Sequence, residues 1–274
     1  MYVAAFLAAL AGVPALADGE GTTELTEMMT AYDARGWEGV GRLNIGWGGM
    51  CTGAMIAPNL VLTAGHCLYN SRTGNQVNPA TIQFHAGWRN GHASASRKVR
   101  RAVIHPDYVF TGPESDNLTV SNDLAILELD SDIRLANIQP FTTGKRPRKG
   151  ATVGVVSYAH DRAESPSIQE TCHVLARRQG ALVLSCDVDF GSSGAPIFAE
   201  VDGTPQIVSV VSAKGEVRGR RVSLGTNLEK PLSEMMVLLK SGGGVSARKT
   251  PEVRMMKPDT PRTLTSGGAK FLRP

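Results

Sequence analysis

Three short strings place a histidine, an aspartate and a serine in a fixed order along this chain. His66 stands in the string TAGHC, Asp123 in DLAIL and Ser193 in GSSGAP. A serine hydroxyl is a useful nucleophile at neutral pH only when a neighbouring base takes its proton, and an imidazole with a pKa near ~6.5 suits that task. A carboxylate on the far side of the imidazole orients the ring and stabilises its positive charge. The fold must therefore bring three distant segments together.

The order of the three residues separates the known folds that use them. Chymotrypsin-type barrels run His, Asp, Ser, whereas subtilisins run Asp, His, Ser and α/β-hydrolases run Ser, acid, His. Over about residues 39–240 the chain resembles the chymotrypsin (trypsin-like) serine protease family. The resemblance implies an endopeptidase that forms an acyl-enzyme, with His66 as base, Asp123 as its orienting acid and Ser193 as nucleophile. It also implies an oxyanion hole made by the N–H groups of Gly191 and Ser193.

One position departs from the family pattern. The family usually has an acidic residue directly before the nucleophile, which pairs with an N-terminal amine released by zymogen cleavage, but this chain has Ser192. We therefore expect the nucleophile loop to form without that ion pair. Bacterial glutamyl-endopeptidase-like and HtrA-like relatives also lack the acid, and the chain is similar to them in this respect.

The resemblance gives three candidate substrate-binding residues. Ser212 would lie beside the catalytic aspartate, and Lys214 would line the substrate groove. A count back from the nucleophile without gaps puts Asp187 at the floor of the specificity pocket, where an acid selects Arg or Lys, but Cys186 does not fall where trypsin has its neighbouring cysteine. Lys214 could instead favour an acidic side chain, and Asp187 and Asp189 could equally be solvated loop carboxylates. The side-chain preference stays open.

The hydrophobic pattern predicts an all-β fold with one helix. Short alternating apolar runs separated by glycine-rich turns favour closed antiparallel barrels, and the resemblance implies two of six strands each. We expect barrel 1 over about 39–135, barrel 2 over about 150–228, and a crossing within 131–150. A helix at about 230–240 follows from the one-sided spacing of Leu232, Met235, Met236 and Leu239.

The four cysteines indicate two disulfides. Cys51 and Cys67 flank a predicted hairpin and match the family's disulfide beside the catalytic histidine, and Cys172 and Cys186 bracket a second hairpin. Four cysteines permit three pairings, so this pairing is inferred from spacing and from the family. Disulfides imply an oxidising compartment. A zinc site is the weaker alternative, because the chain has no Cys-x-x-Cys or His-x-x-x-His spacing. We expect no metal or cofactor.

The two ends of the chain have distinct compositions. Residues 1–17 read as a signal peptide that ends in small residues before Asp18, and the apolar run is too short for a membrane span of about 20 residues. Residues 18–38 are acidic and are expected to be a leader or propeptide. Residues 241–274 are expected to be a basic disordered tail: after Gly244 seven basic residues face two acidic ones, a net charge of +5 in a chain of +4. A tether to anionic surfaces or nucleic acid is the alternative.

The sequence therefore predicts a secreted or periplasmic peptidase that acts on polypeptides as a monomer, without a transmembrane segment or a nucleic-acid partner. Two other classes remain. A non-catalytic binding protein on the same scaffold would be expected to lose one of the three catalytic residues, and all three are present. An HtrA-like quality-control protease would normally add a peptide-binding domain and lack disulfides, whereas the segment after the helix is too short for such a domain.

Overall fold

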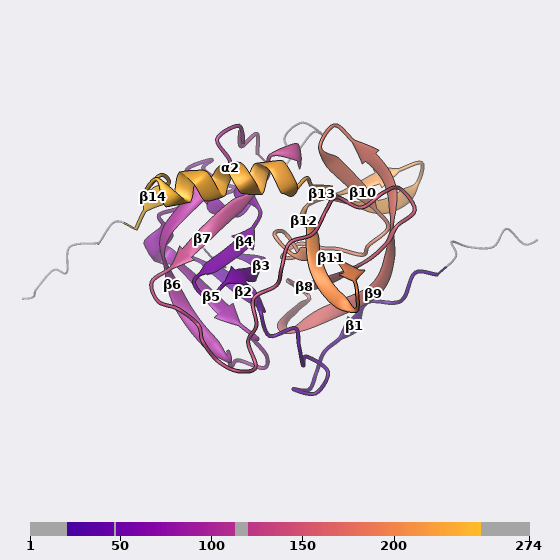
Figure 1. The fold of residues 1–274 in the computed structure, drawn as a ribbon, viewed down its shortest axis with the longest axis horizontal. Helices are drawn as coiled ribbons and strands as arrows, with labels where there is room; N and C mark the ends of the chain where they lie inside the picture. Colours follow the sequence, from indigo (N-terminus) through magenta and orange to yellow (C-terminus); the bar gives the residue numbers. More distant parts are fainter. Residues whose placement is uncertain (1–20, 47, 113–119, 248–274) are drawn as a thin grey trace, which may run out of the picture.

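Two antiparallel sheets lie side by side in the computed structural model, which describes residues 21–46, 48–112 and 120–247 (Figure 1). Short 3-10 helices η1 (Gly65–Leu68) and η2 (Pro79–Thr81) lie within the first half. The first sheet contains β2 (Val40–Ile45), β3 (Gly49–Ala57), β4 (Leu60–Thr63), β5 (Ile82–Ala86), β6 (Ala95–Ile104), β7 (Ala125–Leu129) and β14 (Val245–Ser246). The second contains β1 (Thr26–Glu27), β8 (Thr152–Ala159), β9 (Arg162–Arg178), β10 (Ala181–Leu184), β11 (Pro196–Val201), β12 (Thr204–Val217) and β13 (Arg220–Thr226).

Each sheet closes on itself into a ring of six strands. In the first sheet the strand order is β14-β6-β5-β2-β3-β4-β7, and β6 also pairs with β7. In the second the order is β1-β9-β10-β13-β12-β11-β8, and β9 also pairs with β8. The two-residue strands β14 and β1 are added outside the rings. Closure satisfies the strand edges that an open sheet would expose. The expected pair of six-stranded barrels is confirmed.

The two barrels share an apolar core at their junction. Trp37 precedes the first barrel, Phe141 lies in the crossing segment, and Phe198 lies on β11 of the second barrel. The centroid of the Phe198 ring is 4.9 Å from that of Trp37 and 4.8 Å from that of Phe141. Such aromatic contacts add stability beyond their buried area. Residues that approach the junction from either barrel are therefore held in a packed environment.

A helix after the last long strand returns the chain to the first barrel. This helix, α2 (Glu229–Lys240), buries Leu232, Met235 and Leu239, as the spacing predicts, and the expected C-terminal helix is confirmed. Figure 1 shows α2 lying along the first barrel, and the Arg101 side chain on β6 donates to the carbonyl of Leu239 at 3.0 Å. Among the described residues, no helix is long and apolar enough to cross a bilayer.

The chain ends join the fold more closely than we expected. Within the segment assigned to a leader, β1 pairs with β9, and Met28 is only 1% exposed and donates its N–H to the carbonyl of Pro166. Within the segment assigned to a disordered tail, Val245 and Ser246 form β14 against β6. Backbone pairing at the open side of a barrel strand explains both differences. The predicted signal peptide and the tail from residue 248 onward lie outside the described residues.

Candidate active site

The three candidate catalytic residues come from three different segments at the junction of the barrels. His66 lies in η1, directly after β4, and Asp123 precedes β7, which pairs with β4. Ser193 lies in the loop between β10 and β11 of the second barrel. Because β4 and β7 are hydrogen-bonded neighbours, the start of β7 places its preceding residue beside the end of β4. Sheet pairing thus brings the imidazole and the carboxylate together.

Asp123 accepts hydrogen bonds from three donors. Its Oδ2 lies 2.7 Å from Nδ1 of His66, and its Oδ1 accepts the backbone N–H of His66 at 2.7 Å. The Ser212 hydroxyl on β12 of the second barrel donates to Oδ2. The carboxylate is only 3% exposed, and charge-assisted hydrogen bonds are the usual compensation for burying a charge. The resemblance placed Ser212 beside this aspartate, and the structure shows it there.

These contacts set the state of the His66 ring. An ionised carboxylate can only accept, so Nδ1 of His66 carries the proton and Nε2 keeps a lone pair in the neutral ring. Burial favours the neutral ring, but the charge of Asp123 and its hydrogen bond outweigh burial and raise the pKa of His66 above its ordinary value of 6.5. The arrangement can accept a proton at Nε2 and stabilise the resulting imidazolium.

The nucleophile loop is held against the first barrel by Thr52 of β3. The Thr52 backbone N–H donates to the carbonyl of Ser193 at 2.8 Å, and its hydroxyl donates to the carbonyl of Gly191 at 2.9 Å. A Cβ added to Gly194 would lie 2.1 Å from Oγ1 of Thr63 and 2.3 Å from the carbonyl oxygen of Thr52. The loop therefore requires glycine at 194, where φ is +79°. No motif in the sequence marks Thr52.

Within residues 191–195, two backbone N–H groups have no hydrogen-bond partner among the described residues. The N–H groups of Ser192, Gly194 and Ala195 donate to the carbonyls of Asp189, Val211 and Ser192, respectively. By contrast, in the part of the chain that the structure describes, the N–H groups of Gly191 and Ser193 make no hydrogen bond. These are the two donors expected for the oxyanion hole. Unpaired donors beside a nucleophile can bind a developing negative charge.

Ser192, the residue before the candidate nucleophile, forms hydrogen bonds with neutral groups. Ser192 is fully buried, and its hydroxyl lies 3.2 Å from Oγ of Ser157 and 3.3 Å from the carbonyl oxygen of Tyr158. The backbone N–H of Asp189 donates to the same hydroxyl at 3.3 Å. The guanidinium of Arg162 donates from Nη2 to Oγ of the same Ser157 at 3.4 Å. Hydrogen bonds among β8, the start of β9 and the loop thus replace the ion pair that the family usually has.

The proposed substrate-binding residues lie in different surroundings. Nζ of Lys214 is 2.7 Å from Oδ1 of Asp189 and 3.9 Å from the centroid of the Phe190 ring. The hydrogen bond from Lys214 and the backbone N–H of Phe190 lower the pKa of the Asp189 carboxyl. Asp187 is exposed, and its backbone N–H donates to Oε1 of Gln169. Lys214 therefore faces the nucleophile loop through Asp189, a partner that the sequence did not identify.

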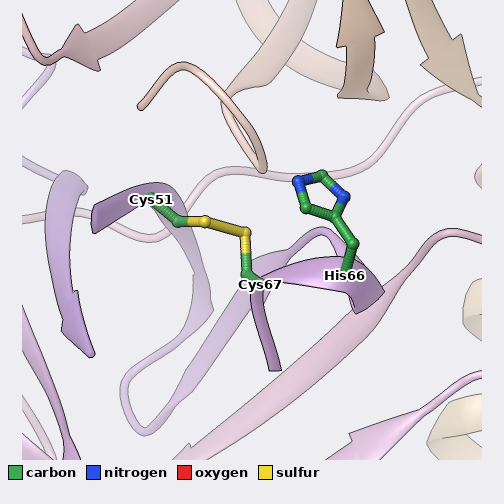
Figure 2. A group of neighbouring side chains, drawn as sticks. All are labelled: Cys51, His66 and Cys67. Carbon is green, nitrogen blue, oxygen red and sulfur yellow. A yellow bond between two sulfur atoms is a disulfide. The ribbon is translucent and has the colours of Figure 1, made fainter. Parts of the chain in front are cut away.

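Two cysteines lie beside the imidazole, as Figure 2 shows. Ligand atoms of Cys51, His66 and Cys67 all lie within 4.8 Å of one another, a spacing that could suit a metal. However, Cys51 and Cys67 are joined in a disulfide, and so are Cys172 and Cys186. Zinc takes cysteine as thiolate, which a disulfide does not offer. Cys51 and Cys67 therefore form a covalent link between β3 and η1.

Comparisons with known proteins identify the class. The family model "Trypsin" matches residues 30–229, and the chain belongs to this family. The match begins inside the segment that we assigned to a leader. A solved structure described as Glu endopeptidase in complex with MPD has a TM-score of 0.64 and 21% identity, and it covers 81% of this chain and 98% of that one. The fold is therefore chymotrypsin-like, as the sequence predicted.

Among curated proteins the chain matches parts of several relatives. It is 25% identical over 187 residues to a glutamyl endopeptidase of Bacillus licheniformis, covering 66% of this chain and 57% of that protein. It is 34% identical over 87 residues to the complement C1r-B subcomponent of Mus musculus, covering 30% of this chain and 12% of that protein. Trypsin 5G1 of Aedes aegypti is 30% identical over 111 residues, covering 40% of this chain and 35% of that protein. The chain thus spans about half or less of these relatives' length.

Proposed function

We propose that this chain is a secreted serine endopeptidase that uses His66, Asp123 and Ser193. The observation that carries the proposal is the buried Asp123 carboxylate, which is bonded at once to Nδ1 and the backbone N–H of His66 and to Ser212 of the other barrel. A carboxylate that only capped a strand would not need the imidazole. Membership of the trypsin family supports the same activity.

The mechanism follows from the positions of the groups. Oγ of Ser193 attacks the carbonyl carbon of a peptide bond while Nε2 of His66 takes the hydroxyl proton. The carbonyl oxygen becomes an oxyanion that the N–H groups of Gly191 and Ser193 bind. The C–N bond then breaks, His66 returns the proton to the leaving amine, and an acyl-enzyme remains. Water repeats the sequence in place of the amine and regenerates the free serine.

In this account the polypeptide substrate lies between the barrels. Lys214 and Asp187 suggest opposite preferences for the side chain on the acyl side of the scissile bond. Lys214 favours an acidic side chain, since its ammonium can exchange Asp189 for a substrate carboxylate, and the bacterial relative is named a glutamyl endopeptidase. Asp187 favours Arg or Lys. Cleavage of a peptide library decides between them: acidic residues at the cut support Lys214, and basic residues support Asp187.

The proposal includes export and processing. Residues 1–17 act as a signal peptide, and the peptidase domain covers about 39–240 and functions as a monomer. Two disulfides fit an oxidising compartment outside the cytoplasm. Because β1 and Met28 pack on the second barrel, removal of all of residues 18–38 as a leader would remove these contacts. The N-terminus of the purified protein, read by mass spectrometry, tests both boundaries.

A non-catalytic binding protein is the second candidate. One observation favours it: among the described residues no hydrogen bond joins the Ser193 hydroxyl to His66. Catalytic hydrogen bonds are often long without substrate and tighten when it binds. Hydrolysis of an unfolded protein by the wild type, lost in Ser193→Ala, supports the peptidase. Equal hydrolysis by both proteins, or none by the wild type while it binds the same polypeptide, overturns it.

A further inference from the structure

A groove lies on the second barrel, on the side of the sheet away from its core. It has a volume of about 1130 Å³ and is lined by residues of β9, β10, β12 and β13 and of the turns between them. Figure 1 labels these four strands on the second barrel. Val183 on β10 pairs with Ala176 on one side and Leu224 on the other, so these three side chains share a face. Leu182 and Leu184 alternate with Val183 and lie in the core cluster, so Val183 faces outward into the groove.

The groove offers apolar surface to solvent. Leu175 is 42% exposed and Val217 is 48% exposed, and both line it. Single exposed apolar side chains are ordinary, but here they adjoin the outward-facing row described above. A continuous apolar floor in a groove is typical of surfaces that bind another polypeptide.

Arginines form the rim of this groove. Arg178, Arg218 and Arg220 are exposed, and none of them forms an ion pair with any residue that the structure describes. Glu216 is the one acidic residue among those that line the groove. Arg218 occupies the turn between β12 and β13 with φ of +53°, where glycine or asparagine is usual. The rim is therefore strongly positive and free to pair with carboxylates.

The groove begins a few residues from the candidate active site along β12. On β12, Ser212 contacts Asp123, Lys214 contacts Asp189, and Gly215 already lines the groove. Three residues of strand span about 10 Å. One extended polypeptide is therefore long enough to occupy both the junction between the barrels and the groove.

We propose that this groove is a docking site for an acidic segment of a protein substrate, outside the residues that surround the scissile bond. Carboxylates of that segment pair with Arg178, Arg218 and Arg220, and its apolar side chains cover the floor. Arginine matches a carboxylate with two parallel hydrogen bonds, which suits this recognition. The apolar floor distinguishes this surface from a phosphate-binding one. The inference rests on the proposed function for its substrate, but docking itself needs no cleavage.

The test measures binding in the full chain carrying Ser193→Ala. A fluorescent peptide of alternating glutamate and leucine is titrated by anisotropy against this protein and against one that also carries Arg178→Gln, Arg218→Asn and Arg220→Gln. Asparagine tolerates the positive φ at 218. We expect the three changes to weaken binding about tenfold, because exposed charge pairs contribute little singly but sum. A matched control, Arg72→Gln, Lys98→Gln and Lys240→Gln, removes the same charge from exposed positions on the first barrel and its helix, and should leave the affinity within twofold.

A second variant guards against loss of folding. Arg178→Glu with Arg220→Glu should bind a lysine-leucine peptide more tightly than the parent protein does, a gain that misfolding would not produce. Equal weakening by the groove and control variants, or preferential binding of a single-stranded oligonucleotide over the acidic peptide, overturns the proposal. If docking is found but the wild type cleaves nothing, the peptidase function alone fails. If short peptides are cleaved and groove changes do not raise KM for an acidic protein substrate, docking alone fails.

Discussion

The carboxylate of Asp123 binds His66 twice, through Nδ1 at 2.7 Å and through the backbone N–H at 2.7 Å. The second bond fixes the position of the main chain that carries the imidazole, and the first fixes the ring. Ser212 then ties the same carboxylate to the other barrel. One buried charge thus holds the imidazole in place and links it to the half of the molecule that carries Ser193.

Replacing this carboxylate should abolish most activity without unfolding the protein. In Asp123→Asn the amide can donate to Nδ1 of His66, which places the ring proton on Nε2. A protonated Nε2 cannot accept the hydroxyl proton of Ser193. We expect kcat to fall about 10⁴-fold. Hydrolysis of a short peptide ester measures it, with circular dichroism as the folding control. A loss of less than tenfold would argue against the assigned role of Asp123.

The pH dependence follows from the raised pKa of His66. The ring must be neutral to act as a base, so kcat/KM should increase with pH and reach half its maximum above pH 6.5. The effect of pH on folding stability has the opposite direction. The contribution of the charged pair to folding is fully present below the unfolded pKa and is lost as the pH increases through the higher folded value. A half-maximum below pH 6.5 would show that Asp123 does not stabilise the imidazolium.

Gly194 should tolerate no side chain. In Gly194→Ala a Cβ would clash with Thr63 and with the backbone of Thr52, in addition to the strain of a positive φ. Gly203 is a matched control, because its φ is +75° but no atom lies within 4 Å of its added Cβ. Urea denaturation should show a loss of about 1 kcal/mol for Gly203→Ala and at least about 3 kcal/mol for Gly194→Ala. Equal losses would mean that the loop does not pack as closely as the structure shows.

The Thr52 hydroxyl should be required for a competent nucleophile loop. Thr52→Val removes the hydroxyl that donates to the carbonyl of Gly191. The backbone N–H of Tyr158 also loses its acceptor, Oγ1 of Thr52, which lies 3.0 Å away. Leaving these buried groups unpaired costs about 1–3 kcal/mol each. We expect a lower free energy of unfolding and a lower kcat, both restored in Thr52→Ser. If Thr52→Ser and Thr52→Val behave alike, the hydroxyl has no such role.

The sequence predicted the parts of this protein that short strings encode. The barrels, the helix and the candidate catalytic residues follow from strand patterns and three motifs. Contacts between segments that are distant in the sequence could not be predicted. Glu164, Ser165 and Pro166 do not follow a strand pattern in the sequence, yet they belong to β9, because pairing with β8 forms the first part of that strand.

The surroundings of the site depended on the same kind of contact. Thr52 is the one hydroxyl residue of β3, and its role appears only when the loop of the second barrel lies against it. Lys214 was expected in the substrate groove at the active site. Its pairing with Asp189 could not be predicted, because it depends on the turn geometry of the loop that carries Ser193. Tertiary packing, rather than local propensity, decides both.

The position of a covalent adduct tests most directly whether His66 and Asp123 activate Ser193 as a nucleophile. The wild-type protein is treated with a fluorophosphonate, which reacts with an activated serine, and the modified peptide is identified by mass spectrometry. We expect one adduct, on Ser193, whose formation is strongly slowed in His66→Ala and Asp123→Asn and which is absent in Ser193→Ala. No adduct in the folded protein, or an adduct whose rate is the same in His66→Ala, would contradict this expectation.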